Sequence, residues 1–67
     1  MNTEISEQHV LLLRAVANGF VEGIHGGDMW DNASRTLHPG VSDEFYECAA
    51  LGQHMGRALR LVLKETT

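Results

Sequence analysis

Apolar residues recur at steps of three and four in two separate segments of this 67-residue chain, a spacing that places them on one face of a helix. Ser6 precedes the first segment as a candidate N-cap, because its hydroxyl can accept from a free amide of the first turn. Gly26 and Gly27 follow the segment and supply a stop signal. We therefore predict a helix over residues 7–25, with a buried stripe made of Val10, Leu13, Ala17, Phe20 and Ile24.

The second segment repeats this pattern after a turn signal at Pro39 and Gly40. Ser42 is its candidate N-cap, and Asp43 and Glu44 place negative charge at the positive end of the helix dipole. These features predict a helix over residues 43–64, with a stripe made of Phe45, Ala49, Gly52, Met55, Leu59 and Val62.

The pattern predicts an all-α fold, because no segment shows the strict alternation of a half-buried strand. We expect residues 1–67 to form a single domain, a two-helix antiparallel hairpin with a long loop over residues 26–41. Gly19 and Gly23 fall inside the first helix, where they either weaken it or allow another helix to approach closely. The loop is either pinned to the helices by Trp30 and Leu37 or forms a binding surface, since tryptophan is common at binding hot spots.

Charge and composition exclude several classes of function. The formal net charge of −4 argues against a DNA- or RNA-binding protein, which needs Lys and Arg to displace counterions from phosphates. No apolar run approaches the ~20 residues that span a bilayer, so we expect no membrane contact. The N-terminus lacks the features of a signal peptide. Cys48 is the only cysteine and cannot form an intramolecular disulfide, so we expect a cytoplasmic location.

The chain is near the lower size limit for a self-sufficient core. Each predicted helix carries more apolar surface than one mutual contact covers, and Leu11 and Leu61, for example, lie off the main stripes. No disulfide framework makes up the difference. We therefore predict that the hairpin assembles with itself into a homo-oligomeric helical bundle, such as a four-helix bundle.

The sequence carries no strong catalytic or metal-binding motif. His9, His25, His38 and His54 are scattered, whereas structural zinc requires four closely spaced ligands. Cys48 lies on or beside the stripe of the second helix, where a cysteine is more typical of a core than of a reactive thiolate. We expect no enzymatic activity, no metal and no cofactor.

Three basic residues form a strip on the second helix at spacings of three and four, namely Arg57, Arg60 and Lys64. They either complement the negative end of the helix dipole as solvated charges or hold an anion such as phosphate. In an oligomer, such strips repeat around an interface and concentrate positive charge. Further candidates for ligand contact, two of them basic and two aromatic, are Arg14, Arg35, Trp30 and Tyr46.

Two stretches carry a resemblance to a known family. Residues 4–12 read EISEQHVLL and are followed by Ala15, Val16 and Ile24, and residues 50–64 read ALGQHMGRALRLVLK. Together they resemble phage-encoded helical-hairpin cyclic-nucleotide sponges of the anti-CBASS and anti-Thoeris type. The resemblance implies a homo-oligomer that acts in the bacterial host, sequesters cyclic nucleotides in pockets between protomers and performs no turnover.

The sequence thus predicts a small binding protein that acts by stoichiometric sequestration or inhibition. The alternative is a protein–protein interaction module that inhibits or regulates a host protein. A nucleotide sponge must gather its arginines around one concave pocket. An interaction module instead exposes an apolar patch that includes Leu11, Trp30 or Leu61.

Overall fold

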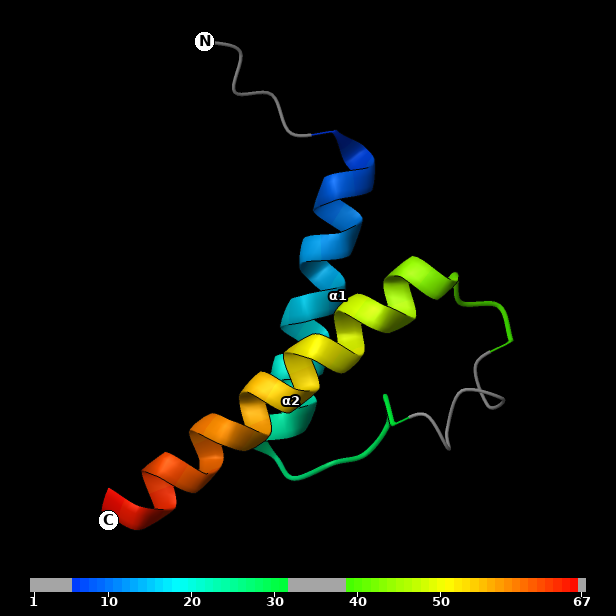
Figure 1. Ribbon diagram of the computed structural model, residues 1–67. Helices are drawn as coiled ribbons and strands as arrows, with labels where there is room; N and C mark the ends of the chain where they lie inside the picture. The colour runs from blue at the N-terminus through cyan, green and yellow to red at the C-terminus, as the bar shows by residue number, and fades with distance from the viewer. Residues whose placement is uncertain (1–5, 32–38, 67) are drawn as a thin grey trace, which may run out of the picture.

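The protein consists of two long helices in the parts of the chain that the computed structural model describes, residues 6–31 and 39–66 (Figure 1). Helix α1 runs over Glu7–Ile24 and helix α2 over Asp43–Thr66, with no strand in the described ranges. The all-α, two-helix prediction is therefore confirmed, and the helix ends lie within two residues of their predicted positions. The predicted loop includes residues 32–38, which lie outside the described residues. Arg35, Leu37 and His38 belong to this range.

Both predicted N-caps are in place. The Ser6 hydroxyl accepts from the His9 amide at 3.2 Å, and the Ser42 hydroxyl accepts from the Phe45 amide at 3.2 Å. At the other end of α1, Gly26 has a φ of 79°, a left-handed conformation that side chains rarely adopt. Local sequence thus determines where α1 begins and ends, and where α2 begins.

The two helices run in the same general direction, not antiparallel as predicted. Gln8, near the start of α1, donates to the Glu44 carboxylate near the start of α2 at 3.2 Å. Arg60, late in α2, donates to the Ile24 carbonyl at the end of α1 at 2.7 Å. The reason lies in the connection over residues 25–42. It is long enough to return past α1, which spans only about 27 Å at 1.5 Å per residue.

The helices cross with their backbones in close contact. A Cβ atom added at Gly19 would overlap the Ala49 carbonyl oxygen, and one added at Gly52 would overlap the Val16 carbonyl oxygen. Glycines therefore bring these backbones closer together than larger residues allow, which decides between the two roles considered for the glycines of α1. The small residues buried on this crossing face are Ala15, Gly19, Gly23, Ala49, Gly52 and Gly56.

The predicted buried stripe is correct only in part on each helix. On α1, Phe20 and Ile24 are half-buried, whereas Ala17 is exposed. Leu13 is 60% exposed and Val10 38% exposed, because the glycine face of α1 meets α2 in their place. In α2, Ala49 and Gly52 are buried as predicted, whereas Met55, Leu59 and Val62 are exposed. The bulky apolar residues therefore point away from the contact between the helices.

Candidate functional site

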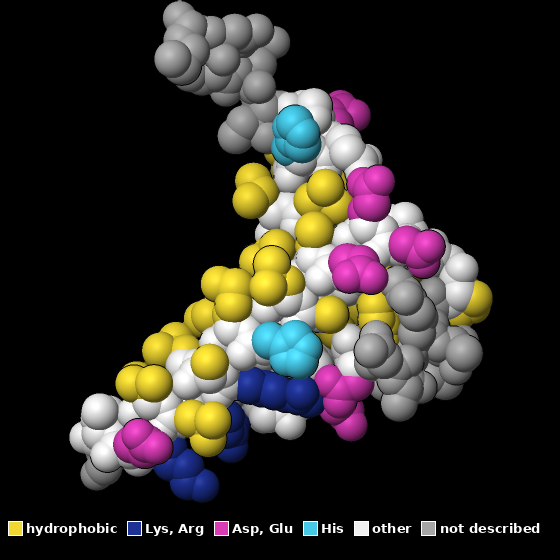
Figure 2. All heavy atoms as spheres, in the orientation of Figure 1, with side chains coloured by type: hydrophobic (Ala, Val, Ile, Leu, Met, Phe, Trp, Pro, Cys, Tyr) yellow, Lys and Arg dark blue, Asp and Glu magenta, His cyan; other side chains and the backbone are white. Residues whose placement is uncertain are grey.

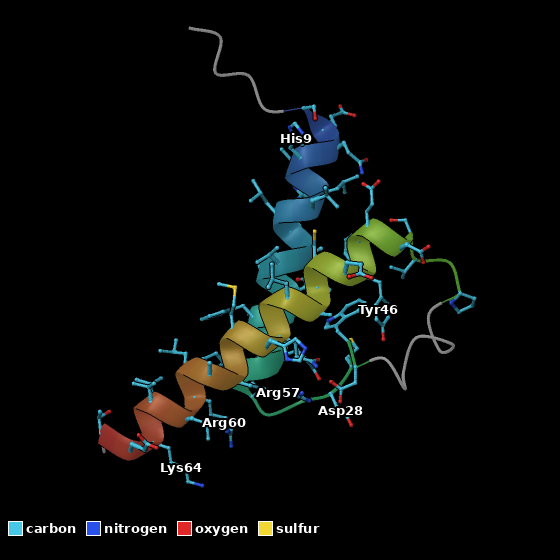
Figure 3. All side chains as sticks on the ribbon, viewed as in Figure 1. His9, Asp28, Tyr46, Arg57, Arg60 and Lys64 are labelled. Carbon is cyan, nitrogen blue, oxygen red and sulfur yellow. The ribbon has the colours of Figure 1, made fainter. Side chains whose placement is uncertain are left out.

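Several residues that the sequence singles out for ligand contact meet where the connection after α1 lies against α2. Asp31 stands at the centre, and Trp30, Tyr46 and Arg57 all contact it or its neighbours. Figure 3 shows Tyr46 and Arg57 projecting from α2 toward the segment that carries Asp28. We call this set, Gly27, Trp30, Asp31, Tyr46, Gln53 and Arg57, the Asp31 cluster.

Arg57 holds the connection through two groups. Its Nη1 lies 3.1 Å from Asp31 Oδ1, and its Nη2 donates to Asp31 Oδ2 at 3.3 Å. The same Nη2 donates to the Gly27 carbonyl oxygen at 3.1 Å. A planar guanidinium suits this arrangement, since its donors form a rigid fork that can span a carboxylate. An anionic ligand at Arg57 must therefore compete with a carboxylate already bound there.

Gln53 is fully buried and joins the connection to the helix crossing. Its Oε1 accepts from the Trp30 amide at 2.9 Å, and its Nε2 donates to Asp31 Oδ1 at 2.6 Å. Within residues 6–31 and 39–66, no buried side-chain nitrogen or oxygen lacks a hydrogen-bond partner. The buried amide is thus satisfied by the connection, as a polar group removed from water requires.

Trp30 packs its ring between two aromatic side chains of α2. Its centroid lies 5.6 Å from that of Tyr46 in an edge-to-face arrangement and 5.9 Å from that of Phe45 in a tilted one. The Tyr46 hydroxyl donates to the Asp31 carbonyl. The sequence left two roles open for Trp30, attachment of the loop to the helices or part of a binding surface. Trp30 is buried, and its described contacts correspond to attachment. Aromatic pairs with these geometries stabilise a contact beyond the apolar area they bury.

The surroundings of Asp31 favour its ionised form. The hydrogen bond from Arg57 lowers the pKa of the carboxyl group below its ordinary value of 3.8, and burial opposes this shift. The charge of Arg57, the hydrogen bond from Gln53 and the nearby His54 lower the pKa further. Asp31 therefore acts as a fixed negative charge and accepts from Arg57 and Gln53.

The remaining predicted ligand contacts do not gather at one place. Arg60 donates to the Ile24 carbonyl at 2.7 Å, where it lies over the end of α1. Lys64 is exposed near the end of α2, and Arg14 is exposed on α1, where it lines a shallow hollow with Leu11. Arg35 lies outside the described residues. The structure brings together Trp30, Tyr46 and Arg57, but it joins them to Asp31 and Gln53, which the sequence prediction missed.

A second feature is a broad apolar surface on the outside of the helix pair. Figure 2 shows hydrophobic side chains in a nearly continuous run along one edge of the molecule, over α1 and the C-terminal half of α2. We call this surface the outer apolar face and define it by five exposed side chains. Four of them recur at steps of three and four along α2, namely Leu51, Met55, Leu59 and Val62, and the fifth is Leu13 of α1.

A groove joins the α1 and α2 parts of the outer apolar face. His9, Leu12, Leu13 and Val16 line it from α1, and Cys48 lines it from α2. Cys48 is half-buried with a free thiol. The face is therefore a single surface that crosses from one helix to the other. Because α1 and α2 contact each other through their glycines, these large side chains stay uncovered.

The described residues contain no cluster of three or more His, Cys, Asp or Glu side chains placed to hold a metal ion. None of the helices in the described ranges is long and apolar enough to span a membrane. Comparison with protein-family models, with curated proteins and with solved structures gives no match.

Proposed function

We propose that this chain is a non-enzymatic protein–protein interaction module that binds through its outer apolar face. The observation that carries the proposal is a row of four apolar side chains along α2, each at least 38% exposed, which Leu13 of α1 joins across the groove lined by Cys48. Monomeric proteins rarely leave apolar patches larger than a few hundred Å² uncovered, and those that do use them for binding. Of the three residues that the sequence nominates for such a patch, Leu11 and Leu61 are exposed and Trp30 is buried, and none of the three belongs to the outer apolar face.

Sequestration of cyclic nucleotides, the function that the family resemblance implies, stays a prediction. Arg57 already binds the Asp31 carboxylate, and Arg60 already donates to the Ile24 carbonyl. A phosphate at either arginine must displace one of these internal partners. No contact among the described residues favours a nucleotide over a protein as the ligand.

The free thiol of Cys48 supports an interaction module that works in a reducing compartment, and the cytoplasm is the location we propose. Exposed apolar helices suit the binding of other helices, which lay an apolar stripe into a groove. Such binding requires no chemistry, so the protein acts by occupancy alone.

The test is complex formation in cell lysate by the tagged chain and two variants of equal charge. Met55→Glu adds a carboxylate to the outer apolar face. Asn18→Glu adds one to an exposed position of α1 on its other flank and serves as the control. We expect native electrophoresis to show a complex with the unchanged chain and with Asn18→Glu, but not with Met55→Glu. A complex that Met55→Glu retains, or the absence of any complex, contradicts the proposal.

A further inference from the structure

We draw no further inference here: the strongest candidate, the outer apolar face with the groove that Leu13 of α1 and Cys48 of α2 line, carries nothing beyond the proposed function, because nothing in the described part of the chain shows what covers it.

Discussion

The guanidinium of Arg57 binds the carboxylate of Asp31 across 26 positions of sequence, with Nη1 3.1 Å from Oδ1. This ion pair ties the connection after α1 to the second half of α2. Gln53 binds the same carboxylate one turn earlier along α2. The Asp31 cluster therefore determines how the chain leaves α1 and starts back toward the beginning of α2.

The first prediction concerns the stability of the protein at acidic pH. The folded state lowers the pKa of Asp31, so its ionised form contributes stability above the ordinary value of 3.8, and this contribution is lost as the pH falls through the lower, folded value. We expect the unfolding temperature to fall below about pH 4, and to fall less steeply in Asp31→Asn. Circular dichroism melts over the acidic range measure this. If the unfolding temperature falls equally steeply with pH in both proteins, Asp31 is not the group that contributes this stability.

The second prediction concerns the buried amide of Gln53. Gln53→Met keeps the length of the side chain but removes the acceptor of the Trp30 amide and one donor to the Asp31 carboxylate. We expect a loss of about 1–3 kcal/mol in the free energy of unfolding. Urea denaturation measures it, and the fluorescence of Trp30, the only tryptophan, reports whether the connection moves.

The control for this variant is Gln8→Ala. Gln8 makes an exposed hydrogen bond to Glu44 at 3.2 Å. Removing an exposed bond leaves no polar group buried, so we expect a change within about 0.5 kcal/mol. A comparable loss in both variants contradicts the special role of Gln53.

The third prediction concerns the crossing of the helices. Replacing a helical glycine by alanine normally stabilises a helix by about 1 kcal/mol. At Gly19 and Gly52 we expect the reverse, a loss of about 1–3 kcal/mol, because the new methyl group overlaps a carbonyl oxygen of the other helix. Gly40→Ala is the matched control, since a Cβ there meets nothing within 4 Å. Stabilised Gly19→Ala and Gly52→Ala proteins are incompatible with this crossing.

The fourth prediction separates a lone chain from a pair. Leu13 is 60% exposed in one chain, so Leu13→Ala alters little there. If a second copy covers the outer apolar face, the same change costs about 2–5 kcal/mol per chain. Denaturation at several protein concentrations measures the difference. A change below about 0.5 kcal/mol at every concentration means that Leu13 stays in water.

Local signals made the helices predictable and left their contact unpredictable. Ser6 and Ser42 cap helices through atoms three residues away, so a short window of sequence contains the whole interaction. The stripe through Val10 and Leu13 correctly marks an apolar face of α1. The stripe does not indicate which element covers that face. In the structure, α1 contacts α2 through Gly19 and not through Val10 or Leu13.

The Asp31 cluster depends on pairings that no short window contains. Asp31 and Arg57 meet only because the chain returns along α1, and sequence spacing does not indicate that path. A signal for the crossing was present, however. Small residues recur at Ala15, Gly19 and Gly23 with a spacing of four, which is one face of a helix. If a row of small residues is read as a helix contact in the same way as a row of large apolar residues, it identifies the buried face of α1.

The glycines that bring α1 and α2 together also make each helix weak by itself. Two glycines in α1 and two in α2 each disfavour the helical state by about 1 kcal/mol relative to alanine, and most of the stability of helices in proteins comes from packing against other elements. Neither helix is therefore expected to persist before it meets the other. Folding then becomes a single event in which helix formation and docking occur together, and a peptide of α1 alone stays largely a random coil.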